Sequence, residues 1–147
     1  MVEVEVRGLT KTFGRVTAVR GMSFTAPAGK VTGFLGPNGS GKTTTLRVVL
    51  GLAGALLGDP QVLLHDEPAN GLDPAGIAWL RGLLRGLADD GRTVIVASHV
   101  LSEIAQTADH VVIVSDGQVR FAGALGDIGA SGTALESAFL KLTAAAG

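Results

Sequence analysis

An apolar segment, KVTGFL, runs directly into the polar stretch GPNGSGKTT, which begins at Gly36. Its spacing matches G-x-x-x-x-G-K-[ST], the pattern of a loop whose backbone N–H groups surround phosphate oxygens. A strand before this loop and a helix after it favour phosphate binding over an ordinary glycine-rich turn. Lys42 would then reach the β- and γ-phosphates of a nucleotide, and the Thr43 hydroxyl would bind Mg²⁺. The residues predicted to hold the nucleotide are Gly36, Pro37, Asn38, Gly39, Ser40, Gly41, Lys42, Thr43 and Thr44.

Two carboxylates stand at the end of a second, mainly apolar segment, QVLLHDE. Asp66 stands at the end of the expected strand, where phosphoryl-transfer sites place a magnesium-coordinating carboxylate. Glu67, beside a metal-bound phosphate, would be suited to polarise an attacking water. An Asp-Glu-Pro run also occurs at ordinary strand ends, so this interpretation depends on the phosphate-binding loop upstream.

Two further side chains could take part in the same chemistry. His99 follows the apolar run TVIVAS, and at a third strand end it could hydrogen-bond the γ-phosphate or the attacking water. On its own such a histidine is more often a helix cap or a core residue, and its place at a strand end favours the catalytic role. Phe13, in LTKTFG, could stack on a base or belong to a small hydrophobic core, and the pattern leaves both open.

Strands and helices alternate from Lys30 to Val114, which predicts an α/β fold with a mainly parallel sheet flanked by helices. The segments expected to run in parallel are Val31–Leu35, Val62–Asp66 and Val94–Ser98. Ligands of open α/β sheets bind at the carboxyl ends of the strands. The lysine of the loop, the two carboxylates and His99 should therefore converge on one crevice.

Other elements are expected on both sides of this unit. Alternating residues from Val2 to Arg7 and a strand from Ala18 to Thr25 predict an N-terminal antiparallel β flap over the core. Asp73 before a proline predicts a helix start. The apolar stripe of that helix is Ile77, Leu80, Leu83, Leu84 and Leu87. HVVIVSDGQVRFAG predicts a hairpin with a DG turn, and ALESAFLKLT predicts a last helix.

Length and composition fit one domain, residues 1–147. Apolar residues make up 46% of the chain and aromatic ones 4%, so aliphatic side chains must fill the core. The net charge is −1 without a block of like charge, which argues against nucleic acid as a partner. No apolar run approaches the ~20 residues of a membrane span, and the first residues lack an apolar signal core, so a cytoplasmic chain is expected.

Together, GPNGSGKTT, LLHDEPANGLDP, VIVASH and KTFG resemble the ATP-binding subunit of ABC transporters, and within that family most its drug-export branch. The resemblance covers nearly the whole chain, from Val2 to Thr143. It implies a P-loop NTPase core that binds ATP and Mg²⁺, with the metal at Thr43 and Asp66. It also implies a membrane-spanning partner subunit, which would hold the chain at the cytoplasmic face of the membrane.

The same resemblance assigns roles to single residues. It makes Phe13 the aromatic side chain that stacks on adenine, Glu67 the catalytic base and His99 the switch histidine. Family members work in pairs, so a second ATPase subunit is implied as a partner. The loop expected to contact that subunit is Gly71, Leu72 and Asp73.

The chain departs from the family pattern between Lys42 and Asp66, which are only 24 positions apart. The family places there a glutamine loop and a helical subdomain with the signature LSGGQ, and this sequence contains neither. Up to about Gly54 the sequence resembles the end of the phosphate-loop helix, and from Ala55 the end of the helix after the signature. Joined, the two halves predict one helix from Lys42 to Leu57, ~24 Å long, which can connect two parallel strands.

These features predict an ATP-binding and ATP-hydrolysing exporter subunit whose turnover alone is low, because no signature completes its site. Two alternatives stay open: a non-hydrolysing ATP-binding regulatory module that pairs with an intact ATPase, and an inactive remnant. His65 is a second departure, since an apolar residue is usual before the Walker B aspartate. Alternation points His65 into a helix-facing layer, where an unpaired imidazole would cost about 1–3 kcal/mol, and a tolerated substitution is the favoured interpretation.

Overall fold

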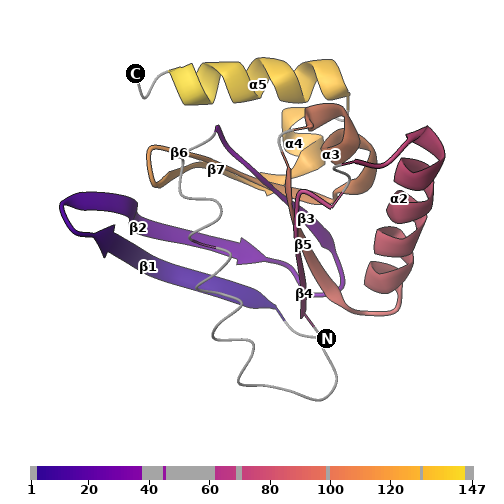
Figure 1. Cartoon of the computed structure of the whole chain (residues 1–147), viewed down its shortest axis with the longest axis horizontal. Helices are drawn as coiled ribbons and strands as arrows, with labels where there is room; N and C mark the ends of the chain where they lie inside the picture. The colour runs from indigo at the N-terminus through magenta and orange to yellow at the C-terminus, as the bar shows by residue number, and fades with distance from the viewer. Residues whose placement is uncertain are drawn as a thin grey trace.

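The computed structural model describes residues 3–37, 45, 62–68, 71–98, 100–129 and 131–144, which form a small antiparallel sheet, a larger mixed sheet and a group of helices (Figure 1). The small sheet, here called the flap, pairs β1 (Val4–Phe13) with β2 (Val16–Ala26). The larger sheet has the order β4-β5-β3-β6-β7. Its strands are β3 (Val31–Leu35), β4 (Val62–Asp66), β5 (Thr93–Ser98), β6 (His110–Ser115) and β7 (Gln118–Ala124).

The larger sheet is mainly parallel, as the alternation of elements predicts. β4 pairs with β5, and β3 pairs with both β5 and β6, all in parallel, while β7 is antiparallel to β6. All of β5 is buried, because Val94 and Val96 contribute to the core on one face and Ile95 to the core on the other. Burial on both faces explains why these strands are continuous apolar runs.

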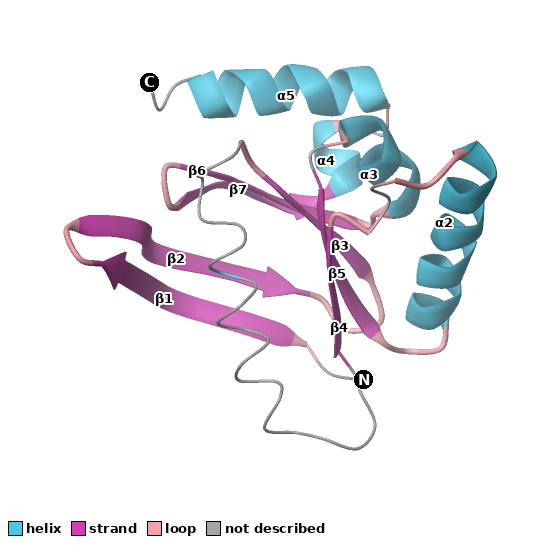
Figure 2. Cartoon of the chain, in the orientation of Figure 1, coloured by secondary structure: helices cyan, strands magenta, loops and turns pink. Residues whose placement is uncertain are grey.

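Helices cover one face of this sheet and the flap covers the other (Figure 2). The helices are α2 (Pro74–Asp89), α3 (Leu101–Thr107), α4 (Leu125–Ile128) and α5 (Gly132–Ala144). Gly33 allows α3 to approach β3 closely, since a Cβ there would lie 2.6 Å from Ile104 Cγ2. Within the described ranges, no helix is long and apolar enough to cross a membrane.

The start of α2 agrees with the sequence, and one residue of its stripe does not. Asp73 caps the helix, with its Oδ1 accepting a 2.8 Å hydrogen bond from Gly76 N. Leu84 is buried, but Leu83 is 42% exposed, so the prediction for Leu83 is wrong. The helix packs against the sheet and α3 along a narrow face, and Leu83 lies beside that face. The helix expected from Lys42 to Leu57 lies outside the described residues apart from Thr45, which is helical.

The two β hairpins contain the left-handed residues that tight turns and bulges require. In the flap, Gly8 takes φ 58 at a bulge, and β1 continues to Phe13, well past the strand end predicted at Arg7. Asp116 and Gly117 have φ 53 and 74 in the DG turn of the second hairpin, as predicted. The short helix α4 was not predicted, because a single turn containing a glycine has no periodicity to detect.

Candidate functional site

The carboxyl ends of the parallel strands form the predicted edge. β3 ends at Leu35, β4 at Asp66 and β5 at Ser98, and the pairing sets Leu35 level with Ser98. Gly36 and Pro37 follow β3 at the same edge, two strands away from β4, which is roughly 10 Å. Outside the described residues lie the other predicted members of the site, Asn38, Gly39, Ser40, Gly41, Lys42, Thr43, Thr44 and His99.

Glu67 has an unfavourable backbone conformation at this edge. Its φ is 50, in the left-handed region that side-chain-bearing residues rarely enter. It also precedes Pro68, and a residue before proline favours extended conformations. Glu67 N donates a 2.8 Å hydrogen bond to Ala97 O, which continues the β4–β5 ladder past the strand end. The fold therefore holds Glu67 in one strained position beside Asp66, as is common at functional sites.

Asp66 offers an exposed carboxylate at the end of β4. Mg²⁺ in nucleotide sites usually takes one or two carboxylates together with substrate phosphates and waters. A carboxylate at the sheet edge, level with the strand that leads into the phosphate loop, fits this requirement. Thr43 is the second protein ligand expected.

Sequence reasoning missed two residues that shape this edge. Ser98 is buried, and its Oγ accepts a 3.0 Å hydrogen bond from Val100 N, which fixes the backbone on either side of position 99. Thr45 is buried, and its Oγ1 donates to Met22 Sδ at 3.4 Å, which joins position 45 to the flap. A serine directly before His99 was the available signal for the first, and nothing in the pattern marked the second.

Two parts of the predicted site, Phe13 and the loop before α2, lie on exposed surfaces. Phe13, at the end of β1, is 56% exposed and is absent from the buried core, so its ring is accessible from outside the chain. Gly71, Leu72 and Asp73 form an exposed loop before α2, which leaves them accessible to another subunit. Gly71 takes φ 80, a conformation that glycine adopts without strain.

His65 lies on the helix-facing side of the sheet, as strand alternation predicts. It pairs with Val96, which belongs to the core beneath the helices. Its Nε2 is buried and finds no hydrogen-bond partner among the described residues, and burial lowers the pKa of the imidazole. We find no contact in the described chain that gives His65 a chemical role.

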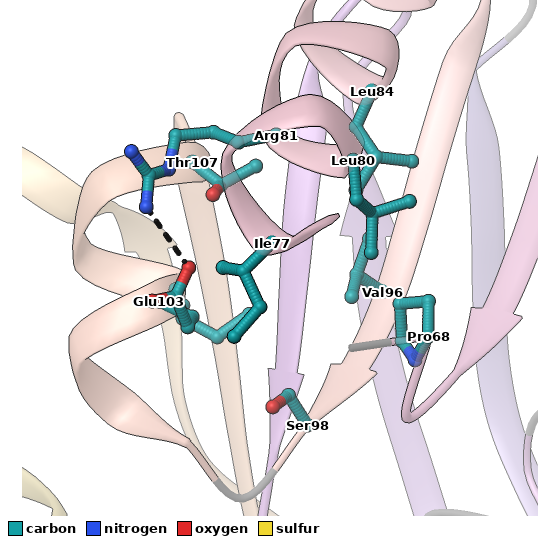
Figure 3. A pocket seen from close by; sticks show the side chains of 10 residues that line it. Pro68, Ile77, Leu80, Arg81, Leu84, Val96, Ser98, Glu103 and Thr107 are labelled. Carbon is teal, nitrogen blue, oxygen red and sulfur yellow. Dashed lines mark hydrogen bonds and ion pairs between the residues drawn. The ribbon is translucent and has the colours of Figure 1, made fainter. Parts of the chain in front are cut away.

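A small cavity of about 30 Å³ lies on the helix side of this edge, between α2, α3 and the end of β5 (Figure 3). Pro68, Leu80 and Ser98 line it, and the ion pair between Arg81 Nη2 and Glu103 Oε2, 3.2 Å long, closes one side. The volume suits about one water molecule and cannot hold a nucleotide.

Comparisons with known proteins agree with this arrangement. The family model described as ABC transporter matches residues 19–54. The bacitracin transport ATP-binding protein of Bacillus licheniformis is 49% identical over 71 residues, which are 48% of this chain and 23% of that protein. A solved ATP-binding subunit of an ABC transporter has the same fold, with a TM-score of 0.77 at 18% identity over 97% of this chain and 99% of that one. The chain is therefore similar, in sequence and in fold, to the ATP-binding subunits of ABC transporters. Proteins of this family bind ATP, generally with Mg²⁺.

The chain is short compared with the relatives that it matches. An uncharacterized ABC transporter ATP-binding protein of Bacillus subtilis (strain 168) is 28% identical over 207 residues, which are 79% of this chain and 68% of that protein. The aligned length exceeds the whole 147-residue chain, so the relative contains a long stretch without a counterpart here. The family-model match ends at residue 54, where the sequence predicts the two helix halves to join.

Proposed function

We propose that this chain, as one domain over residues 1–147, is the ATP-binding and ATP-hydrolysing subunit of a drug-export ABC transporter, in a shortened form with low turnover. The observation that carries the proposal is the carboxyl edge of the sheet. Asp66 and the strained Glu67 lie there, level with the segment that enters the phosphate-binding loop. The identity to a bacitracin transport ATP-binding protein supports the drug-export branch.

In this proposal each residue has a defined part. The loop from Gly36 to Thr44 surrounds the phosphates, with Lys42 at the β- and γ-phosphates. Bound Mg²⁺, held by Thr43 and Asp66, would neutralise charge on the phosphates. Glu67 orients and polarises the attacking water, and its fixed backbone keeps the carboxylate in place. His99, after β5, forms a hydrogen bond with the γ-phosphate or with that water.

The signature missing from the sequence is the reason to expect low turnover. Family ATPases complete each site with the signature of a second subunit, and this chain has no signature to offer in return. An external donor can contribute ~10³–10⁵ in rate in phosphoryl transfer, as an arginine finger does. We propose that the partners are a membrane-spanning subunit and a second ATPase subunit, which contacts Gly71, Leu72 and Asp73, and that the chain is peripheral to the cytoplasmic membrane.

The missing stretch also favours a second candidate, an ATP-binding regulatory module that pairs with an intact ATPase. Its own phosphate loop would face the partner's signature, whereas the partner's loop would face none. Titration of this chain into vesicles that contain an intact transporter should then lower coupled transport. Unchanged or faster transport despite demonstrated pairing would rule this candidate out.

Calorimetry of Mg-ATP binding tests the proposal itself. We expect Lys42→Ala to weaken binding at least about tenfold, because the lysine contacts two phosphates. Lys30→Ala is the matched control, since Lys30 is exposed at the amino end of β3, away from the site. Equal ATP affinity in the wild type and Lys42→Ala would refute the proposal.

A further inference from the structure

Lys11 and Phe13, two residues apart at the end of β1, form a cation–π contact. The Lys11 Nζ lies 5.5 Å from the centroid of the Phe13 ring. Such contacts are attractive within about 6 Å. Phe13 remains 56% exposed, so the ammonium group covers only part of the ring. A ligand can therefore still reach the aromatic surface.

Both side chains lie on the side of the flap that faces the larger sheet. Cross-strand pairing sets Lys11 opposite Val19. The register shifts on both sides of Lys11, so β1 itself gives the side: Leu9 packs against the core between the flap and the sheet, and Lys11 and Phe13 follow it at alternate positions. The partner of Phe13, Val16, is 66% exposed, which shows that the tip extends past the core.

The tip of the flap projects beyond the carboxyl edge of the sheet. β6 ends at this edge, and the turn after it is bonded to the flap through a 2.8 Å hydrogen bond from Arg20 N to Gly117 O. A Cβ at Gly117 would lie 2.7 Å from Ala18 O, so turn and flap are in close contact. Lys11 is level with this contact through its pairing with Val19, and Phe13 lies farther toward the tip, beyond the edge where the nucleotide is proposed to bind.

We propose that Lys11 is a positioning residue for the nucleotide base: its ammonium group holds the Phe13 ring as a one-sided stacking platform. An exposed phenylalanine samples several rotamers, and fixing one of them on binding costs entropy. The cation–π contact restrains the ring before the nucleotide arrives, and it leaves the opposite face of the ring for the base. This inference rests on the proposed ATP binding.

Calorimetry with two ligands tests it, using Mg-ATP and inorganic tripolyphosphate, which has no base. Lys11→Gln should weaken ATP binding about two- to fivefold and leave tripolyphosphate binding unchanged. Lys11→Arg should restore most of the ATP affinity. In a Phe13→Ala background, Lys11→Gln should have no further effect. Arg15→Gln removes the same charge from the flap turn, and among the described residues Arg15 shows no ring contact, so it should not reproduce the base-specific loss.

The outcomes separate this inference from the proposed function. Equal losses for ATP and tripolyphosphate, or a loss that persists in the Phe13→Ala background, would mean that Lys11 acts as a simple charge. Unchanged ATP affinity in Lys11→Gln, with a clear loss in Phe13→Ala, would also overturn the inference. No ATP binding by the wild-type chain would overturn the proposed function, and the positioning role with it.

Discussion

The amino and carboxyl edges of the larger sheet hold their acidic residues in opposite ways. At the amino edge, Asp109 Oδ2 accepts hydrogen bonds from Val31 N at 2.9 Å and from Arg85 Nη1 at 2.7 Å. Arg85 Nη1 also donates to Thr107 O at 3.3 Å, so one carboxylate joins β3, α2 and the end of α3. At the carboxyl edge, Asp66 is exposed and Glu67 takes a left-handed backbone conformation.

This difference indicates that the amino edge of the sheet serves stability and that the carboxyl edge serves chemistry. At the amino edge the carboxylate of Asp109 is hydrogen-bonded to groups from elements that are distant in sequence, which is what a structural site requires. The carboxyl edge leaves a carboxylate available to ligands and keeps its neighbour strained, which folds tolerate where function needs it. Substitutions at the amino edge should therefore change stability alone, and those at the carboxyl edge should change nucleotide chemistry.

The largest expected effect is that of Asp109→Ala. The change leaves Val31 N without its side-chain partner and removes the shortest hydrogen bond of the Arg85 guanidinium, so we expect the free energy of unfolding to fall by about 2 kcal/mol. Asp89→Ala is the matched control, because Asp89 is an exposed partner of the same arginine at 3.4 Å and should cost less than about 0.5 kcal/mol. Denaturant unfolding measures both. Similar losses in the two variants would show that the amino edge is no structural site.

His65→Leu should have an intermediate effect, in the stabilising direction. Removing a buried Nε2 that lacks a partner in the described chain should raise the free energy of unfolding by about 1 kcal/mol. Burial lowers the folded-state pKa of His65 below its ordinary value of 6.5. The unfolded chain therefore binds a proton at His65 more readily than the folded chain does. The free energy of unfolding is highest above pH 6.5 in this respect, and it falls as the pH falls through the folded-state pKa.

Unfolding at pH 7.5 and at pH 5 tests this sign. The variant should lose less stability on acidification than the wild type does. Some pH dependence should remain, because burial also lowers the pKa of His110. A less stable variant, or an unchanged pH slope, would count against this account of His65.

Glu67→Gly should have the smallest effect on stability and should abolish turnover. Glycine relieves the strain of the left-handed backbone, but it also makes the unfolded chain more flexible. We therefore expect the free energy of unfolding to rise by only about 0.5 kcal/mol. Asp116→Gly is the matched control, since Asp116 has φ 53 in the hairpin turn, far from the proposed chemistry. It should leave nucleotide binding and turnover unchanged. A clear loss of stability in Glu67→Gly would show that the glutamate stabilises the edge.

Local rules predicted the elements whose signals are local. Asp73 with a following proline marked the start of α2, and the DG pair marked the second hairpin. The parallel strands and their shared edge followed from alternation of strands and helices. The strand order did not, because β5 inserts between β4 and β3 through pairings between distant segments. Leu83 was assigned to the core from periodicity, which cannot tell how wide a face the sheet covers.

The candidate site was predictable in its residue types and less so in its geometry. The position of Asp66 at the strand end was expected from the sequence. The left-handed backbone of Glu67 was not, since a glutamate before a proline favours extended backbone on local grounds. Lys11 carried no motif of its own, and its contact with Phe13 depends on the three-dimensional path of β1.

Steady-state hydrolysis at saturating Mg-ATP, with ATP affinity measured on the same sample, tests the central claim most directly. The 147-residue chain should bind Mg-ATP and hydrolyse it at a rate well below about 1 s⁻¹, because no signature completes the site. A turnover of about 1 s⁻¹ or more, within the usual range for enzymes and abolished by Glu67→Gln, would contradict the account. It would mean that the missing stretch is dispensable for catalysis.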